Sequence, residues 1–195
     1  MSKSDYKYYL EADRIALGQK NTFRELFFDD VWKFQRLLRR LEYMTNCKKN
    51  RFLRKLTAFR FRHISKKLGF TIPINVFDSG LSIAHYGTIV VNGQCKIGKN
   101  CRIHICVNIG SMAGEAYAAP EIGDNCYIGP GAKLFGPIVI GNNTVVGANA
   151  VVNKSFPNGK VTIGGIPAQV ISEKNTEGLL FKGDSEEIQL NKDMK

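Results

Sequence analysis

This 195-residue chain contains three histidines, the residue type whose ordinary side-chain pKa lies closest to neutral pH. Such a side chain can take a proton from a hydroxyl group and return it later in the same reaction. His63 lies in a run of basic residues, where we expect a surface position. His104 either lines a groove or fills a corner of the fold, and the second is the simpler interpretation. His85, the third candidate for such a proton transfer, lies within the segment Ile-Ala-His-Tyr-Gly.

An aliphatic residue returns at every sixth position between residues 97 and 152, with one interruption. The positions are Ile97, Ile103, Ile109, Ile122, Ile128, Leu134, Ile140, Val146 and Val152. A period of six fits neither a helix nor an ordinary strand. It is typical of a chain that turns a corner every six residues, so it predicts a mainly β fold, a parallel β-helix with three flat faces and about 18 residues in each coil.

Two further patterns follow the same coil. A small residue stands two positions before most of the aliphatic residues, at Cys95, Cys101, Cys126, Ala132, Thr144 and Ala150. Asparagine, which tolerates the left-handed backbone of a corner, recurs at Asn100, Asn125 and Asn143. Both periods, that of the aliphatic residues and that of the asparagines, are interrupted by seven extra residues between Ile109 and Ile122. We therefore expect residues 112–119 to leave the coil as a loop, which is a favoured place for binding.

Three segments together resemble a known family. They are Gly-Leu-Ser-Ile-Ala-His-Tyr-Gly-Thr-Ile-Val-Val at residues 80–91, the hexapeptides, and Gly-Ile-Pro-Ala-Gln-Val-Ile at residues 165–171. They are similar to the serine acetyltransferase branch of the hexapeptide-repeat acyltransferases, over about residues 70–172. The resemblance implies a left-handed coil, a homotrimer, and a groove between neighbouring subunits where acetyl-CoA and an acceptor meet. The handedness rests on the resemblance alone, because spacing does not reveal it.

The resemblance also implies roles for individual residues. His85 matches the catalytic histidine, and we expect it to deprotonate an acceptor hydroxyl that attacks acetyl-CoA directly. Contacts to acetyl-CoA, the co-substrate, are expected from Ser111, Pro130, Gly131, Ala148, Ala150 and Pro167, with Lys154 and Lys160 near its phosphates. Candidate acceptor contacts or orienting groups for His85 are His104, Glu115, Tyr117 and Asp78. Backbone amides near Gly110 and Ser111 are candidates for stabilising the oxyanion.

The chain departs from the family where an amino acid's charged ends would bind. Ala84 replaces an aspartate before the histidine, Phe70 replaces the aspartate that orients it, and Ala118-Ala119 replace an arginine–histidine pair. A zwitterion would arrive unpaired, which costs affinity. We therefore expect an O-acetyltransferase acting on a sugar hydroxyl, in surface polysaccharide or a lipid-linked precursor. The alternatives are a serine O-acetyltransferase of cysteine biosynthesis and a non-catalytic β-helix scaffold.

The excess of positive over negative charge is confined to the N-terminal third. Residues 1–70 carry 18 Lys and Arg against 7 Asp and Glu, and the rest carries ten of each. Apolar residues at three- and four-residue steps predict amphipathic helices over 6–17, 23–43 and 52–68. We thus expect a basic helical domain at 1–70, the β-helix at 71–171, and a mobile tail at 172–195, in which residues 179–181 could lay one apolar turn on the body.

Three interpretations of the basic helices stay open. They are a solvated face on helices packed against the β-helix, a peripheral contact with a membrane or lipid phosphate, and nucleic-acid binding, the least favoured because no nucleic-acid motif accompanies the charge. The five cysteines lack metal-ligand spacing, so we expect no metal. Without an apolar span or signal core, the sequence predicts a cytoplasmic protein, with a position at the inner face of the membrane as a further option.

Overall fold

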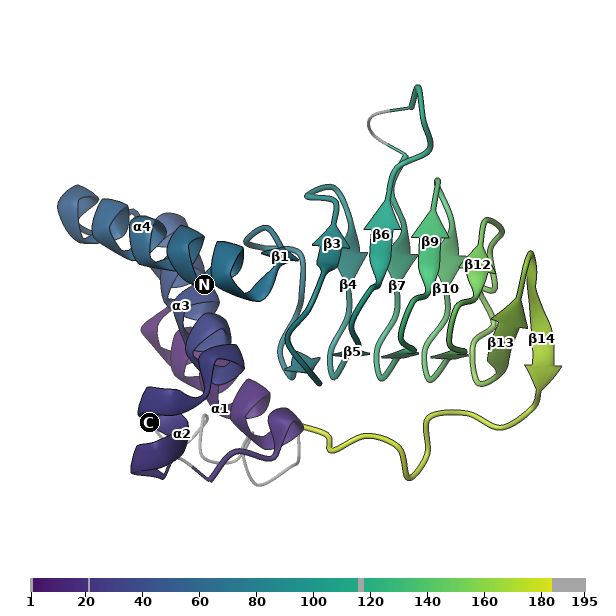
Figure 1. Ribbon diagram of the computed structural model, residues 1–195, viewed down its shortest axis with the longest axis horizontal. Coiled ribbons are helices and arrows are strands. Elements are labelled where there is room, and N and C mark those ends of the chain that lie inside the picture. The colour runs from purple at the N-terminus through teal and green to yellow at the C-terminus, as the bar shows by residue number, and fades with distance from the viewer. Residues whose placement is uncertain (1, 21, 116–117, 184–195) are drawn as a thin grey trace.

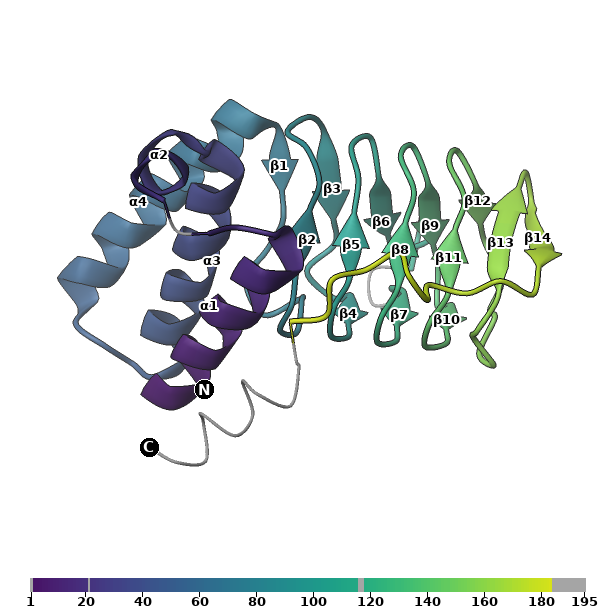
Figure 2. The same cartoon turned by 90° about the horizontal axis from the view of Figure 1, so that it is seen from below.

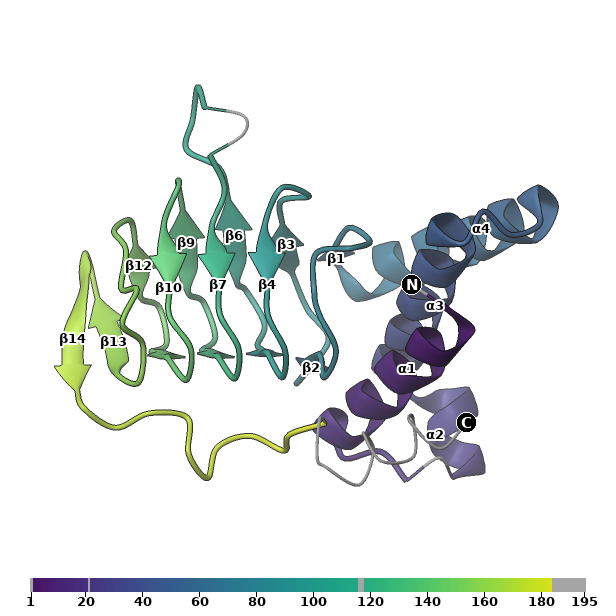
Figure 3. The same cartoon turned by 180° about the vertical axis from the view of Figure 1, so that it is seen from behind.

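The computed structural model describes residues 2–20, 22–115 and 118–183 (Figure 1). Helices come first: α1 Lys3–Leu17, α2 Phe23–Phe28, α3 Asp30–Asn46 and α4 Arg51–Leu68. Short strands then wind into a three-sided prism, with the helices at one end and the last strands at the other (Figures 1 and 3). No helix in the described part of the chain combines the length and apolar character needed to cross a membrane. The predicted order, helices followed by a mainly β coil, is confirmed.

One predicted helix is divided in two. The apolar spacing predicts a continuous helix over 23–43, but the structure ends α2 at Phe28 and begins α3 at Asp30. Asp29 lies between them in an extended conformation, and its side chain accepts a hydrogen bond of 2.9 Å from the backbone N–H of Trp32. A short acidic side chain in that position satisfies a free donor of the next helix. The continuous-helix prediction is therefore wrong, because capping by Asp29 outweighs the apolar periodicity.

Three sheets form the sides of the prism, and their strands are parallel except for the last pair. The five-stranded sheet contains β1 Phe70–Thr71, β3 Ile89–Val91, β6 Asn108–Gly110, β9 Lys133–Phe135 and β12 Val151–Val152. The three-stranded sheet contains β4 Lys96–Ile97, β7 Glu121–Ile122 and β10 Val139–Ile140. The six-stranded sheet contains β2 Ser82–Ile83, β5 Arg102–Ile103, β8 Tyr127–Ile128, β11 Val145–Val146, β13 Thr162–Gly165 and β14 Ala168–Ser172.

The six-residue period determines what fills the prism. Ile128 pairs with Val146, one 18-residue coil later, and Leu134 pairs with Val152 in the same way. All nine repeating aliphatic side chains are at most 4% exposed. The small residues that precede them are buried too, so each of these hexapeptides places one large aliphatic and one small side chain inside. The predicted inward stack is confirmed.

The repeated asparagines form one corner of the prism. Asn100, Asn125 and Asn143 have φ values of 53°, 55° and 58°, in the left-handed region that asparagine tolerates. Their amide groups also join successive coils: Asn100 Nδ2 donates to Asn125 Oδ1 at 2.9 Å, and Asn125 Nδ2 donates to Asn143 Oδ1 at 3.2 Å. The predicted corner is confirmed, and the ladder satisfies side-chain groups that the corner turns toward the interior.

The seven-residue slip corresponds to a projecting loop. β6 ends at Gly110 and β7 begins at Glu121, and part of the described chain between them projects from the coil (Figure 1), whereas Ala119 packs against the core and Pro120 is buried. The register resumes beyond it, because β4 pairs with β7 as Lys96 with Glu121. The predicted loop is confirmed for its described residues.

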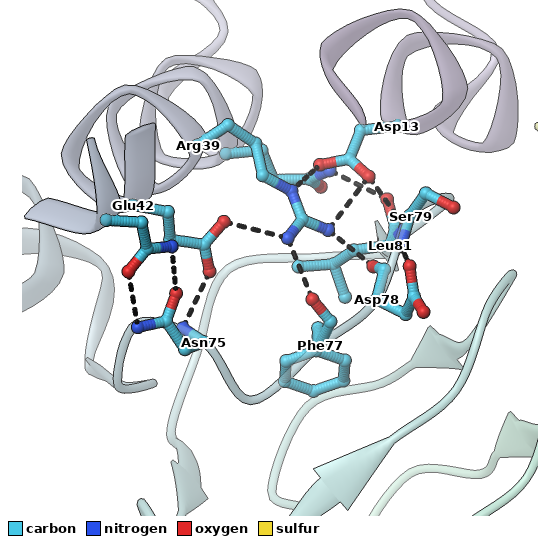
Figure 4. A network of polar contacts seen from close by, with 10 residues as sticks. Asp13, Arg39, Glu42, Asn75, Phe77, Asp78, Ser79 and Leu81 are labelled. Atoms are coloured by element: carbon cyan, nitrogen blue, oxygen red, sulfur yellow. Dashed lines mark hydrogen bonds and ion pairs between the residues drawn. The ribbon is translucent and has the colours of Figure 1, made fainter. Parts of the chain in front are cut away.

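A buried ion network fastens the helices to the first coil (Figure 4). The Arg39 guanidinium in α3 contacts Asp13 of α1 at 2.7 Å and Glu42 at 3.0 Å, and none of the three side chains is more than 2% exposed. The same guanidinium donates to the backbone oxygens of Phe77 at 2.8 Å and Asp78 at 2.6 Å. Burial alone would lower the pKa of Arg39, but the two carboxylates more than compensate and raise it. One cation thus joins two helices and the entry to the β-helix.

The described part of the tail returns along the body. After β14 the chain crosses β11, β8 and β5 toward α1 (Figure 2). The Thr162 hydroxyl donates to the backbone oxygen of Lys174 at 2.7 Å, and the backbone N–H of Gly183 donates to Asn100 Oδ1 at 2.9 Å. Thr176 is buried, whereas Leu179 and Phe181 are exposed. The apolar turn expected at residues 179–181 is corrected, because the described tail contacts the body through polar groups while Leu179 and Phe181 stay exposed; residues 184–195 lie outside the described residues.

Candidate functional site

The candidate site lies at the corner where the six-stranded sheet passes to the five-stranded sheet. We call this the histidine corner and define it as residues 84–88, 104–106, 129–131 and 147–149, one segment from each coil. Backbone hydrogen bonds join the segments: Cys106 N–H to Thr88 O at 2.7 Å, and Gly131 N–H to Ile105 O at 2.9 Å. The repeat therefore builds a straight column of short segments on the outside of the prism.

Two predicted histidines meet at this corner. His85 follows β2 and is exposed, and its ring centroid lies 6.1 Å from that of His104, which follows β5. The His104 ring in turn lies 4.9 Å from the ring of Tyr127 in β8. The pairing of β2 with β5 and of β5 with β8 places the three rings on successive coils. His85 thus faces solvent, as a base that meets a diffusing acceptor must.

The surroundings of His104 favour its neutral form. Its Nε2 atom is buried and has no hydrogen-bond partner among the described residues. Burial lowers the pKa of His104, and the charges of Arg102 and His85 lower it further. An unpaired buried nitrogen is costly unless something satisfies it. The fold itself therefore leaves one nitrogen unexplained on the ring next to His85.

The lowered pKa of His104 predicts a loss of stability in acid. Because the unfolded chain binds this proton more readily than the folded chain does, stability is retained above the ordinary histidine pKa of about 6.5 and falls as the pH drops below it. We expect the free energy of unfolding in urea to fall less steeply from about pH 7.5 to about pH 5 in His104→Gln than in the unchanged chain. His63→Gln, which alters an exposed histidine of α4, is the matched control. Equal slopes for the unchanged chain and His104→Gln would contradict the assignment.

Small residues predicted to contact CoA continue the histidine corner. Pro130, Gly131 and Ala148 lie there, and Asn149 N–H donates to Pro130 O at 2.8 Å. Gly131 has a φ of +76°, and a Cβ atom added to it would come within 2.0 Å of Asn149 Oδ1. Pro167 lies in the turn between β13 and β14, beyond the last full coil. Pro130, Ala148 and Pro167 are exposed along this edge of the coil, and position 131 must be glycine because Asn149 fills the space that a Cβ atom would take.

Other predicted residues lie on the opposite edge of the five-stranded sheet. Ser111 follows β6 and accepts a hydrogen bond of 3.4 Å from Asn92 Nδ2, and Lys154 follows β12 and is exposed. Glu115 is exposed in the projecting loop, and Tyr117 lies outside the described residues. Within one chain, the width of the five-stranded sheet separates these residues from His85.

Two predicted residues occupy other places. The side chain of Ala150 is fully buried, so it fills the small-residue slot of the core and presents no surface to a ligand. The Asp78 carboxylate accepts a hydrogen bond of 2.6 Å from Ser79 N–H and lies beside the Tyr9 hydroxyl of α1. Burial, followed by this contact with Asp78, raises the pKa of Tyr9. The structure thus places Asp78 in the helix junction.

Sequence reasoning missed Arg102 and Tyr127. Arg102 precedes Ile103 in β5, and its Nη1 donates to Ser82 Oγ at 3.1 Å, which holds the cation beside the rings. Tyr127 has the same register position one coil later. Both residues stand immediately before a repeating aliphatic residue, an outward position of the hexapeptide. That position, read together with His104, is the signal that could have identified them.

A surface hollow of about 1100 Å³ lies elsewhere, against α1 and the three-stranded sheet. Tyr8, Tyr9, Lys96 and Asp124 are among its lining residues, and His85 is not. We place the candidate site at the histidine corner because, among the described residues, an exposed imidazole and a buried ring nitrogen without a partner lie side by side there. Within the described residues no group of three or more His, Cys, Asp or Glu is arranged to hold a metal ion.

Several known proteins are similar to this chain. Residues 119–154 match the bacterial transferase hexapeptide family of six repeats. The serine acetyltransferase of Mycobacterium tuberculosis is 36% identical over 104 residues, covering 52% of this chain and 44% of that protein. The serine acetyltransferase of Staphylococcus xylosus is 38% identical over 94 residues, covering 48% and 43%. The match thus spans less than half the length of either curated relative.

Solved structures share the fold. Soybean serine acetyltransferase, as the apoenzyme, has a TM-score of 0.72 and 24% identity, covering 86% of this chain and 69% of that one. Serine acetyltransferase from Brucella abortus in complex with coenzyme A has a TM-score of 0.71 and 24% identity, covering 89% and 70%. At such identity the likeness establishes the fold alone. The sequence matches confirm the resemblance to hexapeptide-repeat acyltransferases, and to serine acetyltransferases in particular.

Proposed function

We propose that this chain, which resembles the serine acetyltransferases, is an acetyl-CoA-dependent O-acetyltransferase with His85 as its general base. The observation that carries the proposal is the position of His85, exposed at the head of a column of small residues where an extended thioester could lie. His104, with its unpaired Nε2, supports it, because the site already holds a group that requires a partner.

In the proposed reaction His85 takes the proton of an acceptor hydroxyl while the oxygen attacks the acetyl carbonyl. The carbon–sulfur bond then breaks, the acetyl group stays on the acceptor oxygen, and CoA leaves as the thiol with the proton that His85 carried. His104 would hydrogen-bond the acceptor, and holding both substrates in one orientation lowers the barrier. Acetyl-CoA supplies the activated acyl group, so the chain needs only to bind, orient and move one proton.

The site residues and the comparisons favour different acceptors. The curated relatives are named serine acetyltransferases, and these names favour serine. The residues favour a hydroxyl compound without an ammonium group: Ala84 carries no charge beside His85, and Phe70 is buried with its ring 5.0 Å from that of Phe34. Arg102 offers a partner for an anion. We therefore propose a sugar hydroxyl, in a neutral or phosphate-bearing saccharide, and keep serine as the second candidate.

The assembly belongs to the same proposal. His85 and Ser111 lie on opposite edges of the five-stranded sheet, so one chain does not bring them together. A homotrimer with a groove between neighbouring subunits, and a left-handed coil, as the resemblance implies, would place one edge of each chain against the other edge of the next. The site would then join the histidine corner to Lys154 and to the projecting loop.

Thiol release from acetyl-CoA tests the acceptor. We expect turnover with at least one sugar or sugar phosphate of a panel to exceed that with L-serine by about tenfold or more, because an unpaired ammonium group loses affinity in this site. A discontinuous assay of free thiol, corrected for hydrolysis without acceptor, gives the ratio. Serine turnover above that of every sugar would assign the chain to serine acetylation and leave the role of His85 intact. The non-catalytic scaffold predicts no affinity for CoA.

A further inference from the structure

One face of α4 is accounted for by the fold. Thr57, Ile64 and Leu68 are buried, and the Phe61 ring stacks on Phe34 of α3 with centroids 5.2 Å apart. The Thr57 hydroxyl also donates to the sulfur of Met44 at 3.4 Å. This face packs α4 against α3 and toward the start of the β-helix, as an amphipathic helix should.

The opposite face of α4 is apolar as well. Phe52, Leu56 and Phe59 follow one another at steps of four and three residues, which places them on one line along the helix. We call these three residues the aromatic stripe; they are 74%, 48% and 70% exposed. Large apolar side chains gathered in this way on a surface mark a contact with something outside the chain.

Cations border the aromatic stripe on both sides. Residues 48–67 contain no Asp or Glu, and their nine Lys and Arg are Lys48, Lys49, Arg51, Arg54, Lys55, Arg60, Arg62, Lys66 and Lys67. Turning by 100° per residue places Arg51, Lys55, Arg62 and Lys66 along one border and Arg60 and Lys67 along the other. Lys67 pairs with Asp30 of α3, so its charge is partly compensated; that partner lies outside α4.

Such a helix is complementary to an anionic lipid surface. Apolar rings enter the region between headgroups and acyl chains, and flanking Lys and Arg bind the phosphates above them. A second copy of α4 would instead bring like charges together, and a duplex nucleic acid would bind the cations through its phosphates while leaving the aromatic stripe in water. Figures 1 and 3 place α4 at the end of the molecule away from β14, where the coil does not cover it.

We propose that α4 docks on anionic bilayers, with Phe52, Leu56 and Phe59 inserted at the interface and the bordering cations bound to lipid phosphates. The β-helix would then stand away from the membrane, with its coils free. The proposal rests on the helix surface and does not depend on the acetyl transfer proposed above.

Vesicle co-sedimentation of the full-length chain tests it. We expect binding to phosphatidylcholine vesicles that contain about 30% phosphatidylglycerol, and little binding to pure phosphatidylcholine, because the cations supply the long-range attraction. The double variant Phe52→Ser/Phe59→Ser should weaken binding to the anionic vesicles by about tenfold or more. Higher salt should weaken the binding of the unchanged chain, because salt screens exposed charges.

The matched control is Phe28→Ser in α2. Phe28 is 74% exposed, as Phe52 is, but α2 carries only one cation, Arg24, and one acid, Glu25. This variant should bind vesicles as the unchanged chain does. Equal binding to neutral and anionic vesicles, equal losses in the stripe and control variants, or no vesicle binding would overturn the proposal. The proposal would also be overturned if the stripe variant formed a smaller oligomer and the unchanged chain did not bind vesicles. Binding of an oligonucleotide without binding of vesicles would overturn it as well.

Discussion

Replacing His85 with alanine should lower turnover by a factor of about 10² to 10⁴, the usual contribution of a positioned general base. The affinity for CoA should stay within about twofold, because the imidazole touches the acceptor oxygen in the proposed reaction and the pantetheine arm lies along the small residues of later coils. Turnover is measured by thiol release with the acceptor that gives the fastest rate, and CoA affinity by calorimetric titration.

Cys106→Ala is the control for this variant. Cys106 carries an exposed thiol at the histidine corner, and it is the residue there that could form an acyl-enzyme. Direct attack by the acceptor predicts near-normal turnover in Cys106→Ala, whereas a covalent route through this thiol predicts a loss as large as that of His85→Ala. A His85→Ala variant with near-normal turnover would falsify the assignment of the base.

Replacing Arg39 with methionine should lower the free energy of unfolding by about 3–5 kcal/mol. The change leaves the carboxylates of Asp13 and Glu42 buried without their cation, and removing one member of a buried ion network has a cost of this size. Two backbone oxygens, of Phe77 and Asp78, lose their donor as well. Urea unfolding followed by circular dichroism gives the value.

Arg40→Met serves as the neighbouring control. Arg40 is the next residue of α3 and is exposed, so its replacement should change stability by no more than about 0.5 kcal/mol. A loss below about 1 kcal/mol in Arg39→Met would mean that the network in Figure 4 does not hold the helices on the coil.

The coil could be predicted from the sequence because its information is local and repeated. Each aliphatic residue of the six-residue period is buried, and each of the recurring asparagines has a left-handed backbone. The slip after Ile109 predicts the projecting loop for the same reason. A period is a property of residues close together in the sequence, so it can be recognised without knowledge of distant contacts.

Contacts between distant residues could not be predicted in this way. Arg39 meets Asp13 and Phe77, which lie 26 and 38 residues away, and nothing in the spacing of these residues joins them. Asp29 is a polar residue within an apolar pattern, and that pattern does not reveal that its side chain caps α3. The tail gave only a polar composition, and its hydrogen bond from Gly183 to Asn100 spans 83 residues.

The candidate site was predictable in part. His85 stood out by its motif, and its neighbour His104 by an off-pattern position, but their approach to 6.1 Å depends on the pairing of β2 with β5. Tyr127 and Arg102 were missed because each is ordinary in composition and acquires meaning only on the outer face of the coil. Ala150 shows the reverse: its small size suggested a surface groove, yet the hexapeptide phase directs it inward.

Calorimetric titration of CoA into the full-length chain tests the central claim most directly, since every role given to the histidine corner requires the thioester to bind there. The account predicts saturable binding at one site per chain that is retained in His85→Ala. A titration without heat above dilution, together with no change in thermal unfolding at high CoA concentration, would contradict it and leave the β-helix as a scaffold.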